Sequence, residues 1–289
     1  MKFVTMRKKG VLKMAIVIVF AAAVIAGVSI TGAATVWSGN SPKRIAIYSV
    51  DTPNQVVALT FNVHNTASAR ISPTNEVVVT NEEGNDIVDE PETKESACCE
   101  GINSILRELE AQNINATFFV SGLWAKQFAP TLNRVVASNR AEIGNLSSTH
   151  PDRFHRLNAH QLEKEIRVAN TTINNLTGVS PKVFRAPNGL YSDRVLNAAN
   201  TEGLVSVQGD IHITNDGVMN SEQIALKVMN SVQNGSIIMI DISNCCQVFD
   251  ALPLVVLGLK NKGFSFVQVS ELVLRENYTL DRAGRQFKE

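Results

Sequence analysis

Three histidines and one aspartate in this sequence stand where a metal site would place its ligands. His64 follows the apolar run "VVALTF", His150 follows "AEIGNL" and His212 follows "LVSVQGD". Asp241 is the last residue of a fourth run, "SIIMID". Imidazole and carboxylate groups are common zinc ligands. The four residues therefore define a candidate metal site, and the plainer alternative is that histidines in loops are structural or solvated.

The cysteines and the two remaining histidines give weaker signals. His155 and His160 flank a predicted helix start and are interpreted as surface groups. The four cysteines form two adjacent pairs, Cys98-Cys99 and Cys245-Cys246. Adjacent cysteines rarely bridge each other, so a disulfide would join one pair to the other. Free thiols and a soft-metal site are the alternatives, because spacing alone does not establish a bridge.

The elements that position these residues alternate as short apolar strands and amphipathic helices. Strands are predicted at residues 44–50, 56–61, 116–121, 141–146, 182–187, 204–210, 236–241 and 264–269. Helices are predicted at 102–112, 130–139, 159–178, 192–203, 221–232 and 250–263. Continuous apolar strands are typical of sheets covered on both faces. The alternation predicts a mainly parallel α/β sheet or barrel, whose chemistry gathers at the carboxyl ends of the strands.

One segment, residues 63–97, interrupts this alternation. It is polar and acidic and is longer than an ordinary connection between a strand and a helix. We interpret it as a solvated surface excursion, and "EVVVTNEEGNDIV" within it as a hairpin with its turn near Glu83-Gly84. A protein partner for this segment is a further hypothesis.

The N-terminus predicts export. Five cationic residues lie within the first 13, and no charged side chain occurs from Met14 to Pro42. This run exceeds the roughly 20 residues that span a bilayer, so residues 1–42 are predicted to be a cytoplasmic basic start and a transmembrane anchor. A cleaved signal peptide is the alternative. The main domain, 43–289, would then lie outside the cytoplasm of a single-pass membrane protein. Equal numbers of basic and acidic residues, 27 each, give no support to nucleic-acid binding.

Residues 43 to 275 resemble the polysaccharide deacetylase family (NodB-homology, carbohydrate esterase family 4), and most closely its membrane-anchored, sporulation-type branch. The resemblance rests on the order of "VVALTFN", "INATFFVSGLW", "AEIGN", "TGVSPKVFRAPNG", "GSIIMID" and "GFSFVQVSEL". It implies an irregular (β/α) barrel of the glycoside hydrolase/deacetylase type. It also implies hydrolysis of N-acetyl groups on peptidoglycan or chitin-like glycans. That reaction needs a divalent metal, usually zinc, together with a general base and a general acid.

The positions that carry this chemistry in the family are substituted here. The resemblance places the base at Asn62, an amide that cannot take a proton. It places metal ligands at Val63 and Leu146, which have no donor atom, and at His150, which remains. The catalytic acid, a histidine in the family, is replaced by Asp241.

Other family positions are partly kept. Arg185 and Pro187 remain in "FRAPNG", where they are expected to contact substrate or hold a carboxylate. Asp210 also remains, whereas His212 stands where the family often has aspartate. A zinc hydrolase needs about three protein ligands, so this count predicts a catalytically impaired, glycan-binding protein of the cell envelope without a cofactor. Two alternatives remain open. One is a metal-dependent deacetylase with a site rebuilt from His64, His150, His212 and Asp241, and the other is an envelope protein-interaction module.

Overall fold

The computed structural model describes residues 45–65, 69–71, 77–79, 92–213, 219–242 and 247–289. Residues 44–289 form one unit. Within the described residues no helix is both long and apolar enough to cross a membrane. The predicted anchor at 14–42 and the cysteine pair Cys245-Cys246 lie outside the described residues.

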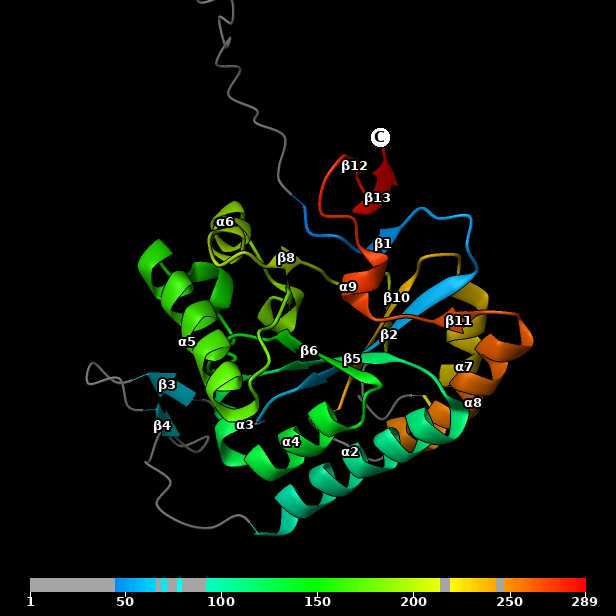
Figure 1. Ribbon diagram of the computed structural model, residues 1–289, viewed down its shortest axis with the longest axis horizontal. Helices are drawn as coiled ribbons and strands as arrows, with labels where there is room; N and C mark the ends of the chain where they lie inside the picture. Colours follow the sequence, from blue (N-terminus) through cyan, green and yellow to red (C-terminus); the bar gives the residue numbers. More distant parts are fainter. Residues whose placement is uncertain (1–44, 66–68, 72–76, 80–91, 214–218, 243–246) are drawn as a thin grey trace, which may run out of the picture. The chain divides into compact units, whose positions relative to one another are not determined.

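A parallel sheet forms the centre of the fold (Figure 1). Its strands follow the spatial order β8-β7-β6-β5-β2-β10-β9, β11 pairs with β2, and every pairing is parallel. The bounds are β2 Val56–Val63, β5 Ala116–Val120, β6 Ala141–Asn145, β7 Val183–Phe184, β8 Val205–Ser206, β9 Ile211–Ile213, β10 Ile237–Asp241 and β11 Ser265–Phe266. The predicted parallel α/β architecture is confirmed, although several predicted strands are shorter than expected.

The sheet is strongly curled, and chain connectivity shows why. β8 and β9 are the two ends of the strand order, yet only the four residues 207–210 separate them in sequence. Five residue steps span at most about 18 Å. The outer strands of a flat seven-stranded sheet lie about 29 Å apart. The sheet must therefore bend round to bring its two ends together, as a barrel does. Gly209 permits this bend, since a Cβ there would lie 2.7 Å from the carbonyl oxygen of Ile237.

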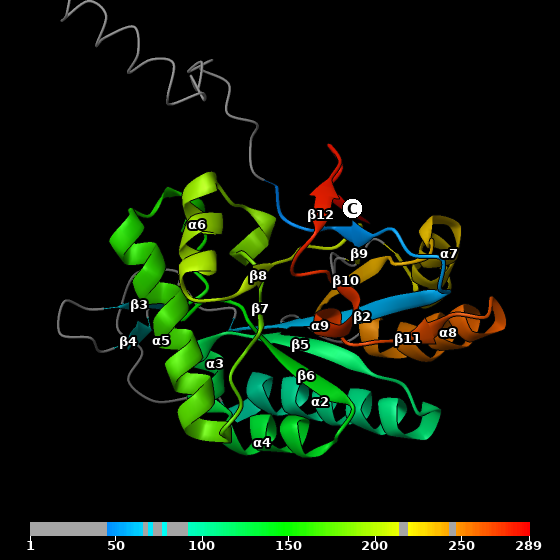
Figure 2. The same cartoon turned by 45° about the horizontal axis from the view of Figure 1, so that its top comes forward.

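Helices cover the outside of the curled sheet (Figures 1 and 2). Successive packing pairs are α7 with α8, α8 with α2, α2 with α4, α4 with α5, and α5 with α6. The bounds are α2 Glu92–Gln112, α3 Gly122–Gln127, α4 Ala129–Ala137, α5 Ala159–Thr177, α6 Asp193–Thr201, α7 Ser221–Ser231, α8 Gln247–Asn261 and α9 Val269–Leu272. Asn158 caps α5 through a reciprocal capping box with Gln161, and Gly178 ends it with a φ of 74°.

The first helix begins earlier than expected, and the excursion contains a hairpin. α2 begins at Glu92, so Cys98 and Cys99 lie inside it and do not precede it. The hairpin of the excursion pairs β3 Ala69–Ile71 with β4 Val77–Val79 in antiparallel fashion. The predicted turn at 83–84 lies outside the described residues.

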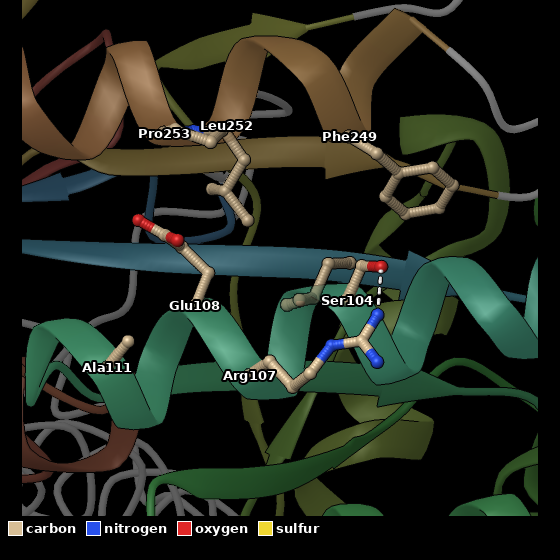
Figure 3. A pocket seen from close by; sticks show the side chains of 8 residues that line it. Ser104, Arg107, Glu108, Ala111, Phe249, Leu252 and Pro253 are labelled. Carbon is tan, nitrogen blue, oxygen red and sulfur yellow. Dashed lines mark hydrogen bonds between the residues drawn. The ribbon is translucent and has the colours of Figure 1, made fainter.

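Side chains along β2 point alternately to the two faces of the sheet, one of which is packed against helices. Val57, Leu59, Phe61 and Val63 face the helices and join a core with residues of α2 and α8. The intervening Ala58, Thr60 and Asn62 face the opposite side. On the helix side, a groove of about 310 Å³ runs between α2 and α8, with Phe249, Leu252 and Pro253 along one wall (Figure 3).

The first and last strands of the described domain pair in a small second sheet. β1 Ser49–Val50 pairs in parallel with β13 Arg285–Lys288, which pairs antiparallel with β12 Tyr278–Leu280. Short 3-10 turns, η1 Phe154–Arg156 and η2 Pro187–Gly189, complete the fold.

Candidate functional site at the carboxyl ends of the strands

Arg185, directly after β7, is the buried centre of the candidate site. Its side chain is 1% exposed, and its guanidinium carbon lies 4.0 Å from the centre of the Phe119 ring. Nη1 donates to Thr60 Oγ1 at 2.9 Å and to Asn62 Oδ1 at 2.8 Å, while Nη2 donates to the carbonyl of Gln208 at 3.1 Å. Every one of these acceptors is neutral. Burial lowers the pKa of Arg185 to about 9, although the charge of Asp241 opposes this effect, and the guanidinium stays charged at neutral pH.

The contact with Arg185 fixes the orientation of the Asn62 amide. Because Oδ1 accepts from the guanidinium, the NH₂ group must face away from it. Asn62 is 8% exposed, and its position pairs with Asp241 of β10 in the sheet register. An aspartate here would offer a proton acceptor, whereas this asparagine offers a hydrogen-bond donor.

His64, His150 and Asp241 come together near the same end of the sheet. The imidazole rings of His64 and His150 stack with 3.6 Å between their centres and 9° between their planes. His64 Nε2 lies 3.5 Å from Asp241 Oδ2. His64 Nδ1 donates to the carbonyl of Asn65 at 3.0 Å, which orients the ring. Three of the four residues of the predicted metal site therefore form one cluster.

The loop that carries His150 is held by Glu165 of α5. The carboxylate, 6% exposed, accepts hydrogen bonds from the backbone N–H of Ser148 at 3.0 Å and of Thr149 at 2.9 Å. It also accepts from Thr149 Oγ1 at 2.9 Å. Burial raises the pKa of Glu165, and these hydrogen bonds oppose the rise by favouring the carboxylate.

Asn145 and Ser147 complete the support of this loop. Asn145 Oδ1 accepts from the Ser147 N–H at 2.7 Å, and its Nδ2 donates to the carbonyl of Ile166 in α5. Ser147 Oγ in turn accepts from the N–H of His150 at 3.0 Å. His150 has a φ of 52°, a left-handed conformation that is uncommon outside glycine. The backbone at His150 is therefore set by a network that does not include the imidazole.

The His150 ring is neutral over the physiological pH range. Burial, followed by the nearby His64, lowers its pKa to about 3, and Asp241 opposes this effect. A neutral imidazole can in principle ligate a metal. However, each ring's lone pair lies in the ring plane, so the lone pairs of two nearly parallel rings do not meet at one point. Zinc holds its nitrogen ligands about 2.0–2.1 Å away, so His64 and His150 cannot share one ion as they stand.

The other two predicted site residues differ in their relation to this cluster. His212 is exposed on β9, where it pairs with Met239 in the register, and it lies near enough to Asp241 and Arg185 for their charges to act on its imidazole. Burial lowers the pKa of His212, and Asp241 opposes this effect. Asp210 accepts from Ser236 Oγ at 2.9 Å and from the N–H of Ile237 at 2.8 Å. It therefore binds the amino end of β10, four residue steps or about 13 Å along the strand from Asp241.

Two of the three positions that the resemblance assigns to metal ligands hold core residues. Val63 is 1% exposed and packs on the helix side, while Leu146 is fully buried in a core cluster with Phe119. Pro187 is buried at the start of η2. Among the described residues, no group of three or more His, Cys, Asp or Glu side chains is placed to hold a metal ion.

A family model described as polysaccharide deacetylase matches residues 91–207. The chain carries a polysaccharide deacetylase domain. The predicted family is therefore confirmed, and deacetylases of this family are generally metal-dependent.

Several characterised proteins resemble this deacetylase-family chain. It is 30% identical over 171 residues to a bifunctional xylanase/deacetylase of Pseudobutyrivibrio xylanivorans, covering 59% of this chain and 28% of that protein. It is 27% identical over 171 residues to a peptidoglycan-N-acetylglucosamine deacetylase of Bacillus cereus, covering 58% and 62%. The aligned part thus spans less than two thirds of either relative.

The fold of this deacetylase domain also matches solved structures. A CE4 family pseudoenzyme from Bacillus anthracis aligns with a TM-score of 0.63 at 21% identity, covering 79% of this chain and 68% of that one. A mutant of that pseudoenzyme "with restored enzymatic activity" aligns with a TM-score of 0.64. These likenesses show the fold.

Sequence reasoning missed the residues that hold the site together, among them Thr60, Phe119, Glu165 and Gln208. Glu165 did leave a signal. It lies on the apolar stripe of α5 formed by Leu162, Ile166, Ala169 and Ile173. A charged residue on the buried face of a helix needs partners there.

Proposed function

We propose that this domain binds N-acetylated cell-wall glycan, with peptidoglycan as the main ligand, and is impaired as a deacetylase. The observation that carries the proposal is the hydrogen bond from Arg185 to Asn62 Oδ1 at 2.8 Å. It turns the amide NH₂ away from the guanidinium, so the family's base position donates a hydrogen bond and cannot activate water. Such a donor suits the carbonyl oxygen of an acetyl group.

Two further features support impaired chemistry. Val63 and Leu146, at the family's ligand positions, are apolar and buried. Asp241, at the position of the family's acid, lies 3.5 Å from His64. An ionised carboxylate has no proton to donate, whereas the histidine of the family can donate one near neutral pH.

The test combines glycan binding with acetate release by the full chain. We expect the protein to sediment with insoluble peptidoglycan and to release no acetate from peptidoglycan or chitooligosaccharides. Asn62→Leu should weaken sedimentation, whereas Asn133→Leu, at an exposed position on α4, should not. Absence of glycan binding by the unaltered chain would refute the proposal.

A second candidate is favoured by the meeting of His64, His150 and Asp241. These side chains, with His212, would form a rebuilt metal site of an active deacetylase after the two stacked rings separate. Stoichiometric zinc in the purified chain, with acetate release abolished by His150→Ala, would establish this candidate and exclude the first.

The location of the protein belongs to the same proposal. The uncharged run from residue 14 to residue 42 supports a single-pass membrane anchor, and the basic residues before it support a cytoplasmic start. The domain would then face the cell wall. Protease digestion of intact cells, followed by detection of the domain, tests this orientation.

A further inference from the structure

His64 fills the space between two groups that a metal-binding site would use. Its ring covers one face of the His150 imidazole at 3.6 Å, and its Nε2 reaches to 3.5 Å from Asp241 Oδ2. The opposite edge of the ring is held through Nδ1 by the carbonyl of Asn65, whose side chain donates to Gln127 at the end of α3. His64 is thus fixed from both sides.

The loop that carries His150 is also well supported, so the stack joins two segments that are each held in place. Its loop is bound to α5 through Glu165 and Asn145, and Ser147 holds its own N–H. The N-terminus of α3 adds to this support, because the N–H groups of residues 122 and 123 donate to the carbonyls of residues 147 and 148. The backbone that carries His150 is therefore fixed, and the His64 ring is held through its own Nδ1 contact.

The parallel arrangement makes the stack and a shared metal ion mutually exclusive. The rings are 9° from parallel, whereas two imidazoles on one tetrahedral zinc ion direct their lone pairs to a common point. An ion bound to His150 and Asp241 would also need the space that the His64 ring occupies next to Asp241.

We propose that His64 is a plug, whose ring closes the site against divalent cations by stacking on His150 and reaching Asp241. This inference rests on the proposed function and refines it, because a domain that binds glycan without hydrolysing it does not need a metal ion in the site. In this proposal His64 excludes the metal ion. In the rebuilt metal site, by contrast, His64 would bind it.

The test is a calorimetric titration of the full chain with Zn²⁺ alone, using two substitutions at one position. His64→Ala removes the ring, and we expect it to raise the affinity for Zn²⁺ at least tenfold over the unaltered chain. His64→Phe keeps a stacking ring that has no donor atom, and we expect no gain. His160→Ala, at an exposed position on α5, controls for the general loss of a histidine.

A further substitution locates the gained ion. Adding His150→Ala to His64→Ala should abolish the gain. The ring protons of His150 in NMR spectra should also lose their upfield stacking shift in His64→Ala and keep it in His64→Phe, which reports on the stack even where metal affinity is low.

Two outcomes would overturn the plug. Zinc binding by the unaltered chain that both His64→Ala and His64→Phe destroy would make His64 a ligand. Equal affinity in all variants would make it a bystander. Peptidoglycan sedimentation of the same variants is scored separately, so that failure of the plug and failure of the proposed glycan binding are told apart.

Discussion

Asn62→Asp returns a carboxylate to the guanidinium of Arg185. The substitution is nearly isosteric, and it puts a negative charge where the amide oxygen now lies, 2.8 Å from Nη1. The pKa of Arg185 is lowered from 12.5 to about 9, and each pH unit corresponds to about 1.4 kcal/mol. The site therefore disfavours the charged guanidinium by about 5 kcal/mol, even with the nearby charge of Asp241. A carboxylate should offset part of this cost.

The gain is small because the new charge must itself leave water. A hydrogen bond to a charged partner contributes about 1.5–3 kcal/mol, against about 0.5–1.5 kcal/mol for a neutral one. After the desolvation of the carboxylate, we expect Asn62→Asp to raise the free energy of unfolding at pH 7 by about 1 kcal/mol.

The sign of the pH dependence follows from the pKa of the new aspartate. A neighbouring arginine lowers the pKa of a carboxyl group by about 1–3 pH units. The gain should therefore be complete above about pH 4, the ordinary pKa of aspartate, and vanish as the pH falls through the lower pKa of the folded state.

Urea unfolding of the full chain between pH 2.5 and 8 measures both effects. Asn133→Asp, at an exposed position, corrects for the charge change alone. If Asn62→Asp lowers the free energy of unfolding by more than about 1 kcal/mol at pH 7, and this loss is no smaller than the loss at low pH, then position 62 does not face a charged Arg185. Acetate release should stay absent, because Val63 and Leu146 supply no ligands.

Three further substitutions or titrations probe the supports of the site. Gly144→Ala would place a Cβ 2.6 Å from the Phe119 ring, so we expect a loss of about 1–3 kcal/mol in urea unfolding, and a loss under about 0.5 kcal/mol would contradict this packing. Glu165→Gln should cost about 1–3 kcal/mol and shift the NMR signals of His150, whereas Glu163→Gln, on the same helix, should leave them in place. The imidazole of His150 should stay neutral from pH 8 to 5, since its pKa is lowered to about 3, and this lowering should make stability rise with pH between about 3 and 6.5. An NMR midpoint near 6.5 would exclude the buried stack.

The fold could be predicted from the sequence because its signals are local and repeated. Apolar runs correctly predicted β2, β5, β6 and β10. The helical spacing of apolar residues, followed by Gly178, correctly predicted α5. The short strands β7, β8 and β11 were overestimated, since an apolar residue beyond the last sheet hydrogen bond looks the same in sequence.

The site was predicted only in part, for a physical reason. Strand order brought His64, His150 and Asp241 to one end of the sheet as expected. Sequence alone does not give ring orientation, so the stack of His64 on His150 could not be foreseen. The role of Asp210 was not foreseen, because its carboxylate binds the start of β10.

The four-residue step between β8 and β9 has a consequence for how the sheet opens. Edge strands ordinarily fray independently, since each has one neighbour and its own connection to the chain. Here the two edges are consecutive stretches of backbone, and separation of β8 from β7 pulls directly on the attachment of β9 to β10. Amide hydrogens on both edges should therefore exchange with the same opening free energy, as one cooperative unit.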